Sequence, residues 1–212
     1  VIDSGADDLL IKPISTNNLL ARITQLIKAR KPFVVTTEYI GPDRRSGEQR
    51  EETEDIPTLE VPNKLQAKAT GQENVSPEAF QAAVDKAAAV INERKMERHA
   101  HQLVYLAEHI VAPFHKGLAG DHLHEQVDRA AYVATDLARR MEGTRFSHVP
   151  ELCASLLRVI NSIRSAGDKP AIKDLDLLLE LSRATEMAFS SDEKVVALAH
   201  DITNSVDSAV AG

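Results

Sequence analysis

The apolar residues of this chain recur at helical spacing from Ser76 onward, and this pattern limits the possible fold more than any other feature. Ser76 is typical of a helix N-cap, and Pro77 is typical of a first helical position. The stripe that follows predicts one continuous helix as far as Ala112. At about 1.5 Å per residue that helix is about 55 Å long, which is longer than a compact monomer normally needs. The length therefore favours a chain that dimerises.

Shorter helices are expected after the long one, because the later apolar stripes are bounded by capping residues and glycines. The residues that mark their ends are Asp121, Gly143, Ser147, Gly167, Pro170 and the capping box of Ser190 with Glu193. The connections are short and no strand pattern interrupts them. We therefore expect residues 76–212 to form an antiparallel helical bundle.

Residues 1–30 have a different pattern. Leu9–Ile11 form a short apolar run that ends at Lys12-Pro13, as a buried parallel strand would. A helix is predicted after Ser15 as its N-cap. The expected buried face of that helix consists of Leu19, Leu20, Ile23, Leu26 and Ile27. A lone strand and helix cannot bury their apolar surfaces, and the first residue is Val1 rather than Met, so we expect the chain to be truncated at its N-terminus.

One segment carries a family resemblance. The string Gly5-Ala6-Asp7-Asp8-Leu9-Leu10-Ile11-Lys12-Pro13, with the amphipathic helix after it, resembles the last strand and last helix of a response-regulator receiver domain. The resemblance implies that Lys12 contacts a phosphoryl group on an aspartate and that the peptide bond to Pro13 is cis. Leu9 and Ile14 stand where the family usually has aromatic residues, so an aromatic switch is not implied.

The resemblance covers only the end of a receiver domain. In that family the phosphoacceptor aspartate and the acidic metal pocket lie on earlier strands, which this sequence does not contain. The resemblance therefore implies Mg²⁺ and a partner sensor histidine kinase for the complete receiver domain only. We expect no cofactor in this chain, which cannot itself be phosphorylated on a receiver aspartate.

Residues 31–75 have the composition of a linker, with several prolines, an acidic run and few apolar positions. Within them, Gly41-Pro42-Asp43 is ordinary turn chemistry. Arg44 and Arg45 follow directly. They are either solvated residues of that turn or a docking segment for an acidic or phosphorylated partner.

The histidines suggest two kinds of chemistry. His101, His115 and His122 share a heptad phase, but two imidazoles on one helix hold a metal ion at i, i+4 spacing, so no metal site is predicted. Phosphotransfer is the second hypothesis. His115 lies beside a lysine and a glycine, and His200, followed by Asp201, is similar to the phosphoacceptor box of a histidine kinase. The alternative for both is an exposed helix histidine.

The composition argues against several classes of function. No apolar run reaches the roughly 18 residues that a membrane span needs. The net charge is −7, and the basic cluster Arg139-Arg140 is small, which argues against nucleic-acid binding. Phosphate loops, nucleophile elbows and cysteine pairs are absent from the sequence, and the lone Cys153 lies in an apolar run. We expect a soluble cytoplasmic protein that is not an enzyme.

These patterns together predict a mainly α chain with a receiver-domain remnant at residues 1–30, an acidic linker at 31–75 and a helical bundle at 76–212. The bundle is expected to act as a protein-interaction or dimerisation module in phosphorelay signalling. Its partner would be another protein or a second copy of the chain.

Overall fold

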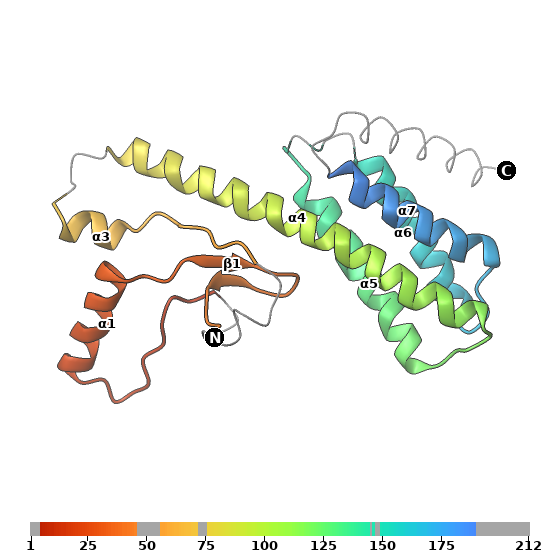
Figure 1. Cartoon of the computed structure of the whole chain (residues 1–212), viewed down its shortest axis with the longest axis horizontal. Coiled ribbons are helices and arrows are strands. Elements are labelled where there is room, and N and C mark those ends of the chain that lie inside the picture. The colour runs from red at the N-terminus through yellow and green to blue at the C-terminus, as the bar shows by residue number, and fades with distance from the viewer. Residues whose placement is uncertain (1–4, 46–55, 72–75, 145, 147–148, 190–212) are drawn as a thin grey trace. The chain divides into compact units, whose positions relative to one another are not determined.

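The computed structural model describes residues 5–45, 56–71, 76–144, 146 and 149–189, and within them the chain is mainly helical (Figure 1). The predicted mainly α fold is confirmed. The chain divides into two compact units, Val1–Lys95 and a second that begins at Met96. This division falls inside the long helix α4 (Pro77–His115), so the compact helical unit begins later than the change of composition near residue 76.

In the first unit, α1 (Thr16–Lys28) begins where the sequence predicts. The Ser15 hydroxyl accepts a hydrogen bond from the Asn18 N–H at 3.2 Å. The Lys12-Pro13 peptide bond is cis, as the resemblance implies. The strand expected at Leu9–Ile11 is not formed, so that prediction was wrong. A strand needs a neighbour for its backbone N–H and C=O groups, and the strands in the described part of the chain pair with each other instead.

The apolar face of α1 is not buried, which corrects a second prediction. No residue of α1 is buried, and Leu19 and Leu20 are exposed. The helix α3 (Lys64–Ala69) packs against α1, and its N-cap Asn63 donates a side-chain hydrogen bond to the carbonyl of Leu26 at 2.7 Å. Because α3 has only 6 residues, it covers part of the face and leaves the rest in solvent.

Residues 31–75 contain a β-hairpin as well as α3. Strands β1 (Phe33–Val35) and β2 (Ile40–Pro42) pair antiparallel and form a two-stranded sheet. The chain turns at Thr36, whose N–H donates to the carbonyl of Tyr39 at 2.8 Å. The β-branched residues of β1 are buried, which explains why so short a hairpin forms in a segment with the composition of a linker.

The turn predicted at Gly41-Pro42 is a strand, so that prediction was wrong. The glycine is required there for a different reason. A Cβ on Gly41 would lie 2.3 Å from the Tyr39 hydroxyl and 2.9 Å from the Gly5 Cα. The close approach of two backbone segments and a ring, rather than a turn, explains this glycine.

Helix α4 is continuous, as predicted, and its first part holds the hairpin. The buried Lys95 ammonium donates to the carbonyls of Thr36 at 2.9 Å and Thr37 at 2.5 Å. The Arg94 guanidinium donates to the carbonyl of Pro57 at 3.1 Å. The carbonyls of Thr36, Thr37 and Pro57 have no partner in a neighbouring strand, and these bonds satisfy them.

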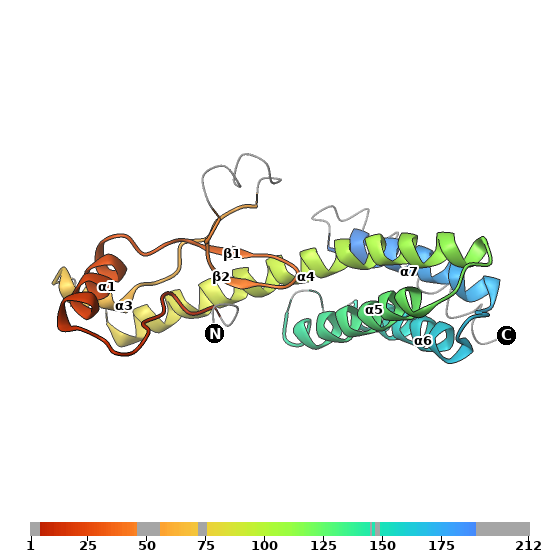
Figure 2. The same ribbon diagram turned by 90° about the horizontal axis from the view of Figure 1, so that it is seen from below.

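The second unit is a bundle of the last part of α4 with α5 (Asp121–Arg140), α6 (Pro150–Ala166) and α7 (Ile172–Ala188) (Figure 2). Short connections join consecutive helices, which run antiparallel, as predicted. The largest buried side chains include Met96, Leu103, Ile110, Leu137, Met141, Leu156, Ile160, Ile163, Leu178 and Leu181. In the part of the chain that the structure describes, no helix is both long enough and apolar enough to cross a bilayer.

The ends of the bundle helices differ slightly from the predicted ones. Asp121 was predicted as an N-cap, but it is the first residue of α5, and Gly120 is the cap. Helix α7 begins at Ile172, shortly after Pro170. Such shifts of a residue or two are usual, because helix ends depend on local geometry that apolar spacing does not specify. Ser147 and the capping box of Ser190 with Glu193 lie outside the described residues.

Candidate functional site

Lys12 and Pro13, the residues that the resemblance assigns to phosphoryl contact, are both exposed. The acidic residues before them are engaged by arginines. Arg30 binds both carboxylate oxygens of Asp7, at 2.7 and 3.0 Å, and Asp8 lies 3.2 Å from Arg22. The acidic pair of the motif is therefore paired with arginines of α1 and of the residues just after it.

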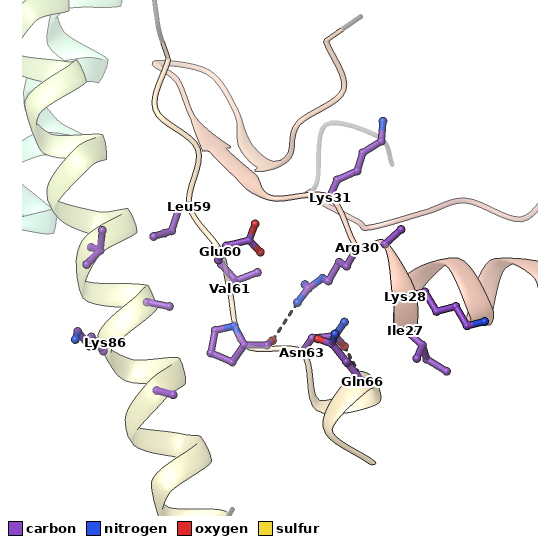
Figure 3. A pocket seen from close by; sticks show the side chains of 15 residues that line it. Ile27, Lys28, Arg30, Lys31, Leu59, Glu60, Val61, Asn63, Gln66 and Lys86 are labelled. Carbon is purple, nitrogen blue, oxygen red and sulfur yellow. Dashed lines mark hydrogen bonds between the residues drawn. The ribbon is translucent and has the colours of Figure 1, made fainter. Parts of the chain in front are cut away.

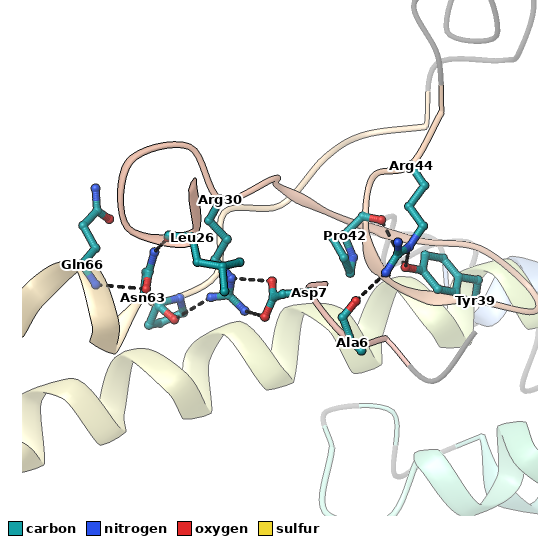
Figure 4. Close-up of polar contacts among 10 residues, drawn as sticks. Ala6, Asp7, Leu26, Arg30, Tyr39, Pro42, Arg44, Asn63 and Gln66 are labelled. Atoms are coloured by element: carbon teal, nitrogen blue, oxygen red, sulfur yellow. Dashed lines mark hydrogen bonds and ion pairs between the residues drawn. The ribbon is translucent and has the colours of Figure 1, made fainter. Parts of the chain in front are cut away.

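Arg30 is the centre of a polar network that ties the end of α1 to segments before and after it (Figure 4). Besides binding Asp7, its guanidinium donates to the carbonyl of Pro62 at 3.0 Å and lies 5.1 Å from the ring centroid of Phe33. A guanidinium has five donors in a fixed plane, so one arginine can hold several acceptors at once. This network explains how residues far apart in sequence stay together in a unit with few buried apolar side chains.

Arg44 and Arg45, the candidate docking residues, both contact their own chain. Arg44 donates to the Tyr39 hydroxyl at 3.3 Å and to the carbonyl of Ala6 at 2.5 Å (Figure 4). Arg45 binds both carboxylate oxygens of the buried Asp43, at 3.0 and 3.2 Å. An acidic partner would have to compete with these contacts, so the structure gives the pair a role in holding the hairpin.

A pocket of about 630 Å³ lies between the end of α1, residues 59–63, α3 and the first part of α4 (Figure 3). Its walls carry several lysines, but the amine ends of Lys28, Lys31 and Lys86 point away from its centre. Arg30 reaches across it and is bonded to the Pro62 carbonyl. The cations do not converge, so the pocket lacks the arrangement that an anionic ligand needs.

The heptad-phased residues of α4 face α7 and form a row of ion pairs, which we call the α4–α7 seam. His101 Nδ1 contacts the carboxylate of Glu186, Arg183 lies 3.2 Å from Glu108, and His115 Nε2 lies 3.4 Å from Asp176. The shared heptad phase, which the sequence shows, places these three residues on one side of α4. His101 and His115 each pair with a different carboxylate of α7.

A second exposed feature of α4 lies beside the seam. The Tyr105 and His109 rings are in contact, with centroids 3.9 Å apart. His109 Nδ1 lies 2.8 Å from the carbonyl oxygen of Tyr105, and because a carbonyl only accepts, Nδ1 carries the hydrogen. An exposed tyrosine at a helix surface is typical of a protein contact face.

The buried polar centre of the bundle is a cluster of His99 and Asp136 with two arginines of α5. His99 Nε2 lies 2.9 Å from the Asp136 carboxylate, and Arg139 and Arg140 each approach the same carboxylate to 2.6 Å. Burial alone would raise the pKa of Asp136. The hydrogen bonds from Arg140, Arg139 and His99 outweigh that effect and hold its pKa well below the ordinary value of 3.8. The carboxylate is therefore charged at neutral pH and holds α4 to α5.

Among the residues that the structure describes, no group of three or more histidine, cysteine, aspartate or glutamate side chains could hold a metal ion. Cys153 is buried, and burial raises the pKa of its thiol to about 12, so the thiol is an apolar core group. His200, one of the two candidate phosphoacceptors, lies outside the described residues. His115, the other, is exposed at the end of α4.

Comparison with protein-family models, with curated proteins and with solved structures gives no match to this chain.

Sequence reasoning missed the residues that pair across helices. Nothing near His99 or Asp136 in the sequence indicates that they meet, because they lie on different helices. The same holds for Glu186, which approaches His101 from α7. A partial signal existed in the repeated heptad phase of His101, Glu108 and His115, which indicates a row facing one neighbour but does not say which helix supplies it.

Proposed function

We propose that residues 1–30 are the C-terminal part of a response-regulator receiver domain and that the bundle is an interaction or dimerisation module in two-component phosphorelay signalling. The observation that carries this proposal is the apolar surface left uncovered between residues 9 and 20. Ile11 is 81% exposed, Leu20 is 56% exposed, and Leu9, Ile14 and Leu19 are each more than 40% exposed.

Uncovered apolar side chains at this density need a partner surface. Burial of apolar surface contributes about 25 cal/mol per Å², and soluble proteins seldom leave such a patch without one. The motif that ends in Lys12-Pro13 indicates which surface fits, namely the earlier strands and helices of a receiver domain. In this proposal the complete receiver binds Mg²⁺ and meets a sensor histidine kinase in the cytoplasm, and the chain described here has no catalytic activity of its own.

Two features favour an interaction role for the bundle. Helix α4 has 39 residues, so at about 1.5 Å per residue it is about 58 Å long and presents a long surface. The aromatic side chains Tyr105 and Tyr132 are exposed on α4 and α5. Exposed tyrosines on rigid helices are typical of contact surfaces between proteins.

The receiver proposal is tested on the natural polypeptide that contains this chain, with beryllofluoride as a mimic of the aspartyl phosphate. We expect Mg²⁺-dependent binding of beryllofluoride to slow hydrogen exchange in α1, and Lys12→Ala to abolish that change. Lys31→Ala is the matched control, because Lys31 is also exposed and also precedes a proline. Equal responses of the two variants would refute the role of Lys12.

The interaction role is tested by sedimentation equilibrium of the chain. We expect a reversible dimer, and Tyr105→Ser with Tyr132→Ser to weaken it. The alternative outcome is a species of 23.2 kDa, the monomer mass, at every concentration, which would refute dimerisation.

A second candidate function is histidine phosphotransfer, which the exposed His–carboxylate pairs of the α4–α7 seam favour. A carboxylate beside an imidazole fixes its tautomer and stabilises its positive charge. The test is phosphoryl transfer to the chain from a phosphorylated, complete receiver domain, with His115→Gln and His200→Gln compared with the parent. Loss of label in one variant identifies the acceptor, whereas no label on the folded parent would refute this second function.

A further inference from the structure

His101 is an exposed histidine of the bundle that contacts a carboxylate. Its side chain is 66% exposed, and its Nδ1 contacts the carboxylate of Glu186 across the α4–α7 seam. An ionised carboxylate only accepts hydrogen bonds, so Nδ1 carries the hydrogen. In the neutral imidazole the lone pair then lies on Nε2, the ring nitrogen that does not contact Glu186.

Other described histidines lack this combination. His109 also places its lone pair on Nε2, but its Nδ1–H is held by a neutral backbone carbonyl. His115 and His124 approach aspartates through Nε2, at 3.4 and 3.2 Å, so the carboxylate occupies the nitrogen that is free in His101. His99 is buried. Among the histidines whose side chains make polar contacts in the described part of the chain, only His101 is exposed, has a carboxylate at Nδ1 and leaves Nε2 open.

The surroundings of His101 also contain a cationic group that suits an oxyanion. Arg98 lies three residues before His101 and therefore on the neighbouring turn of the same side of α4. Guanidinium groups bind phosphoryl oxygens through charge-assisted hydrogen bonds. An approaching phosphoryl group would meet a nucleophile and positive charge together.

We propose that His101 accepts a phosphoryl group on Nε2 from an acyl phosphate, such as a phosphorylated receiver aspartate. The Nε2 lone pair forms the N–P bond as the P–O bond to the acyl oxygen breaks, and that electron pair leaves with the carboxylate. The hydrogen on Nδ1 stays shared with Glu186, whose charge offsets the positive charge on the ring. Glu186 is a positioning residue. This proposal rests on the second candidate function and names its acceptor.

The test uses phosphoramidate, a small-molecule donor that phosphorylates accessible imidazoles and releases ammonia. The complete chain is treated, and mass spectrometry measures the labelling rates of His101 and His109 in the same molecule. We expect His101 to be labelled about a hundredfold faster, the low end of what an oriented proton-sharing group contributes. Because both residues lie on α4, a general loss of folding would change both rates and leave their ratio informative.

Two variants test whether Glu186 acts on His101 directly or only supports the fold. Glu186→Gln should bring the ratio of the two rates close to one, because the amide cannot offset the ring charge. Glu108→Gln is the matched control, since it removes another seam carboxylate that contacts Arg183, and the ratio should stay unchanged. Equal labelling in the parent, or an unchanged ratio in Glu186→Gln, would overturn the proposal. Neither result affects the receiver proposal, which is tested at Lys12 with a different ligand.

Discussion

Replacing Asp136 by alanine should destabilise the bundle more than any other single loss of charge in it. The contact to Arg139, whose side chain is 74% exposed, contributes about 0.5 kcal/mol. The contacts to His99 and Arg140 involve largely buried groups, and a hydrogen bond to a charged group contributes about 1.5 kcal/mol or more. Their sum is about 3.5 kcal/mol, within the range of about 3 to 5 kcal/mol for breaking a buried ion pair.

The assay is urea unfolding of the chain, followed by circular dichroism at the helical minimum. With a slope of about 2 kcal/mol per M, the midpoint of the bundle transition should fall by about 1.7 M. Asp128→Ala is the control, because Asp128 lies on the same helix and its 3.6 Å pairing with Arg164 is exposed on both sides. That variant should lose less than about 1 kcal/mol. Equal losses in the two variants would refute the reasoning from burial.

Three further predictions concern the bundle. The pKa of Asp136 is lowered in the folded protein, so its stabilisation is complete above about pH 4 and is lost as the pH falls below that. The difference in unfolding free energy between the parent and Asp136→Ala should therefore shrink in acid; a constant difference would contradict the lowered pKa. The Cys153 thiol, with its pKa raised to about 12, should react with a disulfide reagent only after urea unfolds the bundle, and rapid reaction of the native protein would be the opposite result. Leu156→Ala, at a fully buried position, should cost about 2 to 5 kcal/mol in urea unfolding, against less than about 0.5 kcal/mol for the exposed Leu118→Ala.

The helices could be predicted from the sequence because their signals are local. The Ser76 hydroxyl accepts a hydrogen bond from the Ala79 N–H, as a cap should, and the apolar stripe of α4 resumes at Leu103 after the polar stretch 92–98. Gly143 has a positive φ of 72°, a conformation that ends the helical path after α5. Such features depend on neighbours within a few residues, so the sequence contains nearly all of the information.

The strand predictions failed because strands depend on partners. Leu9–Ile11 has the apolar character of a buried strand, but that character does not say whether a neighbouring strand exists. The hairpin was missed for the converse reason. Gly41 and Pro42 are turn residues by type, and only the approach of Tyr39 and Gly5 shows that they belong to a strand. Local sequence cannot supply this kind of tertiary contact.

For the candidate sites too, the sequence indicates single residues but not the contacts between distant elements. The resemblance places Lys12 and Pro13 by motif, and the heptad phase places His101 and His115 on one side of α4. Neither signal predicts that Glu186 approaches His101 from α7, a helix that lies far along the chain. Reactivity depends on that approach, so the chemistry of the seam required the structure.

The α4–α7 seam also determines how the two helices align along their length. Moving α4 by one heptad in either direction would place Glu108 where His101 or His115 now lies, opposite Glu186 or Asp176. The same movement would place one of the histidines opposite Arg183. Every alternative of this kind brings two carboxylates together and removes the acceptor from a guanidinium. The order of charges along the two helices therefore favours the observed register over those displaced by one heptad.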